Sequence, residues 1–177
     1  MKPTRLCMLL LPLTLGACAN DPNSHGNKEM AIAQLQPATG QTISGKVMLH
    51  EKDGQLMLHV MLAGLKPDSE HGFHVHEKGD CSKADFTSAG GHFNPASSKH
   101  GSHAGEHHAG DLPNLVADAR GNVDQHIMAH GLTLHGSENG VIGRGFIVHA
   151  NPDDYKSQPA GNSGARIACA RIDQMGM

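Results

Sequence analysis

Alternating apolar and polar residues predict a β-hairpin early in the chain. The strand patterns cover Thr42–Leu49 and Gln55–Leu65, and the dipeptide Asp53-Gly54 between them favours a type I′ turn. Pairing across this turn sets Leu49 opposite Leu58, which makes one face of the hairpin apolar. Because side chains alternate along a strand, the opposite face carries a different set of residues. That set consists of Met48, His50, Met57, His59 and Met61.

Six further segments have the composition of short strands separated by turns or loops. They are residues 72–76, 115–118, 126–128, 132–134, 141–150 and 165–172. No stretch has the periodicity of an amphipathic helix, and the connections over 77–114 and 150–164 are long. We therefore predict an all-β fold, a single antiparallel barrel or sandwich whose function is carried by the two long loops.

The N-terminus has the pattern of an export signal. Lys2 and Arg5 precede the apolar run Met8–Leu15, which is too short to span a bilayer. The sequence LGAC at 15–18 resembles the lipobox of bacterial lipoprotein signals, which are cut before a Cys that is then acylated. We therefore assign 1–17 to a signal peptide, Cys18 to lipidation, 18–30 to a flexible tether and 31–177 to the folded domain. An ordinary signal peptide with an incidental Cys is the alternative.

Cysteine usage supports export independently of the lipobox. Cys7 would leave with the signal peptide and Cys18 would carry lipid, so Cys81 and Cys169 remain. An even pair in an oxidising compartment predicts a disulfide, and two buried free thiols are the alternative. Such a bridge would close a long loop, which the chain-entropy model values at about 4 kcal/mol of stability.

The composition limits the partners of the chain. A length of 177 residues allows one ordinary domain and a short additional segment. Charged residues make up 18% and the formal net charge is −3, which argues against a partner such as the phosphate backbone of a nucleic acid. The 15 His outnumber the 14 Lys and Arg together. Because imidazole is the commonest metal ligand, this excess indicates metal binding.

Histidine spacing indicates where metals would bind. His74 and His76 are two residues apart in a strand pattern, so both rings point to the same side. His149, at the end of an apolar strand pattern, is placed to complete a site begun by that pair. A second cluster lies in a Gly-, Ser- and Pro-containing loop and consists of His92, His100, His103, His107, His108 and Asp111. Three imidazoles and one carboxylate suit tetrahedral zinc, whose binding would shape a loop with few large apolar residues.

Five motifs, taken in order, make the chain similar to the bacterial, periplasmic Cu,Zn superoxide dismutases. They are GFHVHEKGDC at 72–81, GGHFNP at 90–95, HHAGDLPN at 107–114, VHANPDD at 148–154 and GNSGARIAC at 161–169. The resemblance extends from about Ala31 to Ile172. It implies an antiparallel Greek-key β-barrel or sandwich, immunoglobulin-like, with long metal-binding and electrostatic loops.

The resemblance also implies roles for individual residues. Copper would be held by His74, His76, His92 and His149. Zinc would be held by His92, His100, His108 and Asp111, which makes His92 the imidazolate that bridges the two metals. Arg166 would bind the anionic substrate beside the open copper position, and Asp153 would link a copper histidine to a zinc histidine. Cys81 and Cys169 would form the disulfide of the family.

The reaction implied by the resemblance is dismutation of superoxide to dioxygen and hydrogen peroxide. Copper would cycle between two oxidation states, and zinc would be structural. Because the chain is negative, attraction of superoxide must be local, with Lys78, Lys99 and Lys156 as candidates. The implied location is the periplasm, where the enzyme would protect the cell envelope, and Ala19 after the lipobox Cys favours anchoring to the outer membrane. Contact with the membrane would be through the lipid anchor alone, and the choice between a monomer and a homodimer stays open.

Several residues fall outside this resemblance. ACARID at 168–173 lacks the Gly that usually follows the Cys, and Arg171 puts a charge where an apolar residue is common. We interpret four histidines as surface, loop or strand residues without a metal role: His71, His126, His130 and His135. Either His103 or His107 could replace a neighbouring zinc ligand. The hairpin face with Met48 and His50 has two interpretations, an accessory copper entry site or an ordinary strand face exposed to solvent or to a second subunit.

Three other functions agree with parts of the pattern. A lipoprotein that buffers or delivers copper or zinc without turnover explains the histidine content and the export signal, but it explains neither Arg166 nor a shared His92. A family member that has lost one metal is disfavoured because all seven ligand positions are present. A purely structural sandwich would leave the ligand pattern unexplained.

Overall fold

The computed structural model describes residues 29–176, so the expected signal peptide, Cys18 and most of the expected tether lie outside the described residues. The strands are β1 (Glu29–Gln34), β2 (Gln36–Pro37), β3 (Ser44–Lys52), β4 (Gln55–Ala63), β5 (Glu70–His71), β6 (Phe73–His76), β7 (Leu115–Val116), β8 (Val123–Ala129), β9 (Gly145–His149) and β10 (Arg166–Gln174). A short 3-10 helix, η1, covers Thr87–Ala89. Within this part of the chain, no helix has the length and hydropathy needed to cross a membrane.

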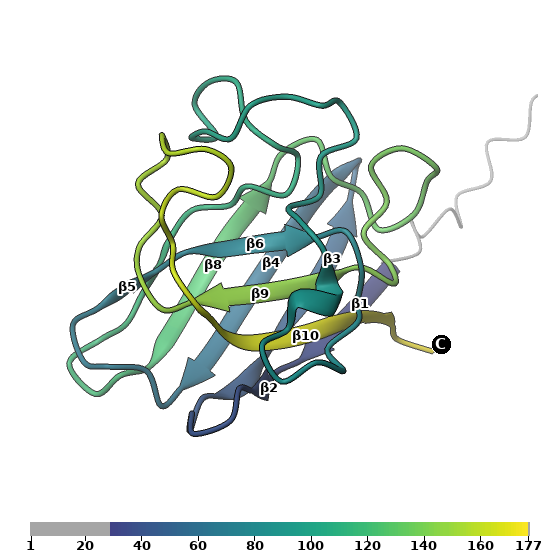
Figure 1. Ribbon diagram of the computed structural model, residues 1–177. Coiled ribbons are helices and arrows are strands. Elements are labelled where there is room, and N and C mark those ends of the chain that lie inside the picture. Colours follow the sequence, from purple (N-terminus) through teal and green to yellow (C-terminus); the bar gives the residue numbers. More distant parts are fainter. Residues whose placement is uncertain (1–28, 177) are drawn as a thin grey trace, which may run out of the picture.

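Most strands belong to one curled antiparallel sheet. Its order is β6-β9-β10-β1-β3-β4-β8, with β2 paired to β10, while β5 and β7 form a separate small sheet. Figure 1 shows β6, β9 and β10 lying in front of β3, β4 and β8, so the sheet folds over and encloses a core between its two halves. The predicted all-β antiparallel barrel or sandwich is therefore confirmed.

The predicted hairpin is confirmed together with its register. β3 pairs with β4, and Leu49 lies opposite Leu58. Both side chains are buried, at 0% and 1% exposure. The turn residues Asp53 and Gly54 have φ values of 53° and 73°, and a type I′ turn requires positive φ at both of these positions.

Two segments differ from the sequence prediction. The tether was expected to extend to residue 30, but β1 begins at Glu29 and runs through the sheet between β3 and β10. Its inward residues Ala31 and Ala33 are small, so the strand has only a weak hydrophobic pattern. Residues 132–134 were predicted to be a strand, but they make one isolated bridge, from Thr133 to Gly140. Gly131 and Gly136 flank this segment with positive φ, so an extended strand does not continue past them.

The core fixes the two strands on which the metal centre depends. Phe73 on β6 and Phe146 on β9 are fully buried and stack with ring centroids 5.0 Å apart. Each such side chain contributes about 1.5–3 kcal/mol by leaving water. Because strand side chains alternate, inward Phe73 and Val75 leave His74 and His76 on the opposite face of β6.

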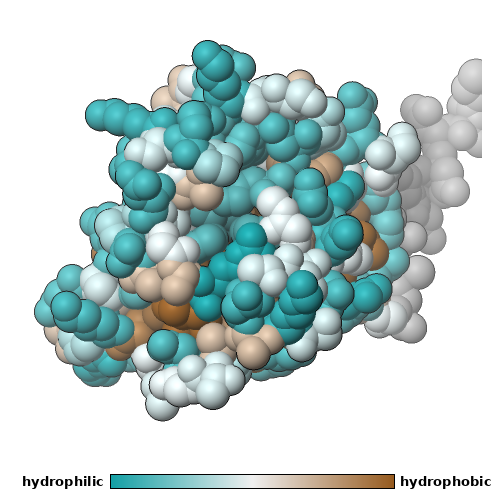
Figure 2. All heavy atoms as spheres, in the orientation of Figure 1, coloured by the Kyte–Doolittle hydropathy of each residue, from teal (hydrophilic) through white to brown (hydrophobic). Residues whose placement is uncertain are grey.

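Two long connections cover that opposite face. One follows β6, and the other joins β9 to β10. Figure 1 shows the later part of the first connection, in teal, and part of the second, in yellow-green, above β6. The side chain of Gln158 joins them, since it accepts a hydrogen bond from His100 N–H at 3.0 Å and donates one to His100 C=O at 2.9 Å. Figure 2 shows mostly hydrophilic residues on this side of the molecule. The two large hydrophobic side chains exposed in the described chain are Val116 and Met175.

Candidate metal centre

Four buried histidines converge beneath the two loops. His74 and His76 come from β6, His149 ends β9, and His92 lies in the loop after β6, where it forms a bridge with His76. Their ligand nitrogens all lie within 4.8 Å of one another. The exposed fractions range from 0% for His74 to 8% for His92. The strand alternation predicted from the sequence therefore places the HxH pair on one side, and the loop supplies the fourth ring.

One nitrogen of each of these rings lacks a hydrogen-bond partner. These atoms are His74 Nδ1, His76 Nε2, His92 Nε2 and His149 Nε2, and each is buried. A buried polar atom without a partner costs about 1–3 kcal/mol, so native proteins rarely contain several together. Metal coordination removes this cost because each neutral ring offers a lone pair to the ion. The four residues therefore fit a metal with an all-imidazole ligand set.

The second nitrogen of each β-strand histidine is held by a protein acceptor. His76 Nδ1–H donates to Gly90 C=O at 3.0 Å, and His149 Nδ1–H donates to Gly164 C=O at 3.1 Å. His74 Nε2 lies 2.8 Å from Asp153 Oδ2. These bonds fix the tautomers so that the lone pairs lie on the unpartnered nitrogens, which is how metal-ligating histidines are usually oriented.

A second group of three histidines and one carboxylate lies next to the first. Asp111 Oδ1 is 2.7 Å from His92 Nδ1 and 3.2 Å from His108 Nδ1, and Asp111 Oδ2 is 3.0 Å from His100 Nδ1. The distance between His92 Nδ1 and His108 Nδ1 is 3.5 Å. Three imidazole nitrogens and one carboxylate at these separations match the ligand set of a tetrahedral zinc ion.

His92 belongs to both groups. Its Nδ1 faces the carboxylate of Asp111, whereas its Nε2 is the unpartnered atom in the all-imidazole group. The ring stacks on His74 with centroids 3.9 Å apart and meets the His108 ring edge-on at 5.5 Å. One imidazole is therefore placed to contact two metal ions through its two nitrogens.

The carboxylate of Asp153 contacts one histidine of each group. Its Oδ2 accepts from His74, and its Oδ1 lies 2.9 Å from His100 Nε2. The main chain of Asp153 is itself fixed by Asn114, which accepts from its N–H at 2.9 Å and donates to its C=O at 3.0 Å. Burial alone would raise the pKa of Asp153, but the hydrogen bonds from His74, Tyr155 N–H and His100 outweigh it and lower the pKa. The carboxylate is therefore ionised and orients one ring of each group.

Gly161 makes this arrangement possible. A Cβ at this position would overlap Asp153 Oδ1 and lie 2.8 Å from His100 Nε2, and the backbone φ is +61°. Gly161→Ala is therefore expected to displace Asp153 and to weaken zinc binding about 10–100-fold, the effect typical of a lost outer-shell partner. Zinc affinity is measured by competition with a chromophoric chelator.

The matched control is Gly105→Ala, a glycine of the connection that holds His100, whose added Cβ would have nothing within 4 Å. This variant should bind zinc as the parent does. Asp153→Asn provides a second route to the same loss without a change in volume. Equal zinc affinities in both glycine variants would show that Asp153 does not support the second group.

Burial keeps the strand histidines neutral. It lowers the pKa of His74 to about 4 and that of His149 to about 3, and it places the pKa of His76 well below its ordinary value. For Asp111, burial acts in the opposite direction, but the hydrogen bonds from His92 and from His108 N–H outweigh it, so its pKa lies well below the usual range. Near pH 7 the centre therefore offers neutral imidazoles and an ionised carboxylate, the forms that bind metals.

These shifts predict that the metal-free protein loses stability on mild acidification. Unfolded histidines take up a proton near pH 6.5, whereas folded His74 does so only near pH 4. Unfolding therefore takes up protons between these values, and the free energy of unfolding falls as the pH is lowered through this window. Between pH 7.5 and pH 5, His74 alone accounts for about 2 kcal/mol. Urea unfolding at pH 7.5 and pH 5 tests this, and equal midpoints would contradict it.

Arg166 stands at the edge of the all-imidazole group. Its Nη1 donates to Phe86 C=O at 2.6 Å and its Nη2 donates to Gly90 C=O at 2.7 Å, the carbonyl that also accepts from His76. Arg166 lines a cavity of about 390 Å³ together with His76, His92 and His149. Burial lowers the pKa of Arg166 from the ordinary value of 12.5. The negative charge of Asp85 raises this pKa but does not outweigh the effect of burial. A guanidinium remains charged under such conditions, so it supplies a fixed positive charge beside the imidazoles.

The disulfide supports the loop that positions Arg166. Cys81 is bonded to Cys169, which confirms the pairing and excludes two free thiols. Cys81 lies in the connection after β6 and Cys169 lies on β10, so the bond ties this loop to the strand that begins with Arg166. Phe86 and Gly90, whose carbonyls accept from Arg166, lie in the same loop. The disulfide therefore holds the two acceptors near their donor.

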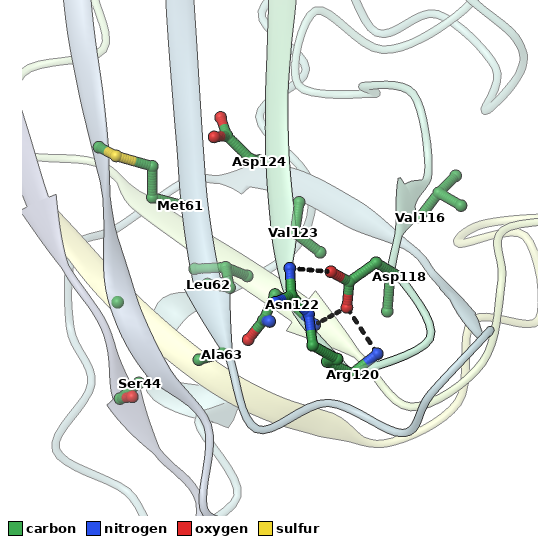
Figure 3. A pocket seen from close by; sticks show the side chains of 12 residues that line it. Ser44, Met61, Leu62, Ala63, Val116, Asp118, Arg120, Asn122, Val123 and Asp124 are labelled. Atoms are coloured by element: carbon green, nitrogen blue, oxygen red, sulfur yellow. Dashed lines mark hydrogen bonds and ion pairs between the residues drawn. The ribbon is translucent and has the colours of Figure 1, made fainter.

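A larger hollow of about 700 Å³ lies at the ends of β4 and β8, and Figure 3 shows the side chains that line it. No histidine is among them. The Asp118 carboxylate accepts from the N–H groups of Arg120 and Asn122, each at 2.8 Å, and lies 3.5 Å from the Arg120 guanidinium. These polar groups close the turn between β7 and β8, and none of the residues of the two buried metal groups lines the hollow.

Sequence reasoning missed part of the support of the centre. His71 was expected to be a surface or loop residue, but it lies on β5 and is buried, because its Nδ1–H donates to His149 C=O at 2.7 Å. No sequence motif indicated that Asn114 and Gly161 support the centre.

Neither His103 nor His107 joins a metal group: His103 is exposed, and His107 Nδ1 bonds to Gly105 C=O. The three candidate steering lysines, Lys78, Lys99 and Lys156, are exposed.

The sequence and fold of the chain are similar to those of known proteins. Residues 43–172 match the family model described as copper/zinc superoxide dismutase. The chain is 43% identical over 147 residues to Superoxide dismutase [Cu-Zn] 2 of Aquifex aeolicus, which covers 80% of this chain and 85% of that protein. It is 36% identical to the extracellular superoxide dismutase [Cu-Zn] of Drosophila melanogaster, over 93% of this chain and 98% of that protein. The crystal structure of a SOD-like protein from Bacillus subtilis has a TM-score of 0.71 and 42% identity, over 78% and 95% of the two chains.

Proposed function

The chain belongs to the copper/zinc superoxide dismutase family, and we propose that it dismutates superoxide with copper in the all-imidazole group and zinc in the carboxylate-containing group. The observation that carries this proposal is the set of four buried imidazole nitrogens without hydrogen-bond partners, on His74, His76, His92 and His149. A structural sandwich would have no reason to keep these atoms unpaired. The ligand types support the division between the metals. Neutral imidazoles suit both oxidation states of copper, whereas a carboxylate with three imidazoles is typical of redox-inert zinc.

When bound, copper supplies the one-electron chemistry by which one superoxide is oxidised to dioxygen and a second is reduced to hydrogen peroxide. The residues of the chain bind superoxide and supply protons. Arg166 holds a fixed positive charge at the cavity where His76, His92 and His149 converge, so it attracts and orients the small monoanion. Hydrogen peroxide needs two protons. His92 lines the same cavity, and its Nε2 would carry one of them while that nitrogen is not coordinated to copper; water would supply the other.

The zinc group has a structural task in this proposal. His100 and His108 lie in a loop with few large apolar residues, and Asp111 brings them together with His92. A bound ion would fix this loop and hold the orientation of the shared ring. His92 would then bridge the two metals and couple the shape of the loop to the position of the substrate.

We place the protein outside the cytoplasm. The disulfide between Cys81 and Cys169 supports this location, because such bonds persist in oxidising compartments. The export signal over 1–17 and the lipobox Cys18 support a periplasmic enzyme anchored by lipid to the outer membrane, where it would protect the envelope from superoxide. A homodimer is one form that this enzyme could take, and sedimentation of the protein at several concentrations tests it.

The proposal is tested with purified protein that is stripped of metal and reloaded with copper, zinc or both. Superoxide dismutation and metal content are measured on the same samples. We expect activity only in samples that contain copper, with zinc affecting mainly stability and loop order. Tight metal binding without activity in any loaded state would instead identify a metal carrier built on the same fold.

A further inference from the structure

The outer face of the sheet half formed by β1, β3, β4 and β8 carries a second cluster of metal-binding side chains. Its members line one hollow of about 350 Å³, and we call them the Met-His face: Met30, Met48, His50, Met57, His59 and His126. The strands that hold them supply no ligand to the metal centre described above. The cluster is therefore a separate feature of the fold.

Strand register places the members of the Met-His face next to one another. Across the sheet, Met30 pairs with His50 and His50 with Met57, while in the neighbouring row Met48 pairs with His59 and His59 with His126. Directly opposed residues have Cβ atoms about 4.5–5.5 Å apart, within reach of these long side chains. Thioether and imidazole groups thus alternate over a small area.

Methionine is concentrated on this side of the sheet. The structure describes six methionines, and five lie at outward positions of β1, β3, β4 and β8: Met30, Met48, Met57, Met61 and Met128. All five are half-buried. Methionine is not among the residues enriched in strands, and none of the five belongs to the buried core, so neither strand propensity nor core packing accounts for this placement.

His50 provides an independent indication of a ligand. Its Nε2 is buried and has no hydrogen-bond partner, the same condition found at the metal-facing nitrogens of the metal centre. Both cross-strand neighbours of His50 are methionines, Met30 and Met57, and neither offers a strong hydrogen bond to the ring. A metal ion in the hollow would satisfy this nitrogen.

His59 is oriented as metal-ligating histidines usually are. Its Nε2 lies 2.7 Å from Asp124 Oδ1, and its ring stacks on that of His126 with centroids 4.1 Å apart. An Nε2–H that donates to the carboxylate leaves the lone pair on Nδ1. Asp124 thus acts on His59 as Asp153 acts on His74 in the metal centre.

We propose that the Met-His face is a binding site for Cu(I), separate from the catalytic metal centre. Thioether sulfur is a soft ligand that selects Cu(I) and does not favour zinc, calcium or magnesium, and imidazole accepts copper readily. The site would be formed by Met48, Met57, His50 and His59, with Met30 and His126 at its border. Its half-exposed position would allow exchange with free Cu(I).

The test uses the full chain with its catalytic centre already loaded with copper and zinc. Cu(I) is added without oxygen in the presence of bicinchoninate as competitor, and copper is counted per chain. We expect about one additional Cu(I), with sulfur scattering in the X-ray absorption spectrum. The double variant Met48→Leu/Met57→Leu keeps the apolar volume and should weaken this binding at least about 10-fold, with dismutase activity unchanged.

Met175→Leu is the control, because Met175 is exposed and does not line the hollow; its N–H donates to Met30 C=O, so this variant also tests whether the border of the site matters, and it should bind Cu(I) as the parent does. Absence of additional Cu(I), or equal binding by the double variant, would overturn the proposal. Binding of Zn(II) in place of Cu(I), lost on Asp124→Asn, would replace it with a divalent site at His59, Asp124 and His126. Self-association through this face without Cu(I) binding would show that the face is a subunit contact.

Discussion

Replacement of His92 by Ala should remove zinc and copper from the protein together and lower superoxide dismutation by at least about 100-fold. The reason is geometric. His92 Nδ1 lies 2.7 Å from Asp111 Oδ1 in one group, and His92 Nε2 is the unpartnered atom of the other. Each group therefore loses a ligand through one substitution. Metal content by mass spectrometry and activity on the same sample measure the effect.

His103→Ala is the matched control for this substitution. His103 lies in the same loop, is exposed and belongs to neither metal group, so this variant should keep both metals and full activity. His100→Ala separates the two sites, because His100 contacts Asp111 but is not a member of the all-imidazole group. The His100→Ala protein should lose zinc and keep copper. Retention of both metals by the His92→Ala protein would contradict a shared ligand.

The sequence was sufficient to predict the elements whose chemistry is local. The Asp53-Gly54 turn and the Leu49–Leu58 register follow from positive-φ residues flanked by alternating apolar positions. The HxH pair on β6 follows from strand periodicity alone, since a spacing of two residues places both rings on one side. Such features depend on neighbours within a few residues.

Other features depend on contacts between distant segments, and the sequence patterns did not reveal them. β1 pairs through small alanines whose hydrophobic pattern is weak, so only its partners β3 and β10 define it. His71 is buried because the carbonyl of His149 lies beside it in the fold. The requirement for Gly161 arises from Asp153 and His100, which come from two different loops. No periodicity of the chain contains this information.

Arg166→Ala is expected to lower dismutation about 10–100-fold while both metals remain bound. Arg166 is not a metal ligand; it contributes a fixed charge at the edge of the cavity lined by His76, His92 and His149. Loss of this charge removes the local attraction of superoxide, which a chain with a net charge of −3 does not provide globally. The activity of the parent should also fall more steeply with ionic strength than that of the variant. Steady-state rates at several salt concentrations measure both effects.

Two further substitutions decide whether Arg166 acts through charge or through position. Arg171→Ala, further along β10, removes an exposed arginine that pairs with Asp173, so it should leave rate and salt dependence unchanged. Arg166→Lys keeps the charge but cannot donate to the carbonyls of Phe86 and Gly90 with the same planar fork, so an intermediate rate is expected. If Arg166→Ala instead released copper, the shared Gly90 carbonyl would be the cause, because it also orients His76. The arginine would then be a positioning residue for the copper ligand, and its charge would have no direct part in binding superoxide.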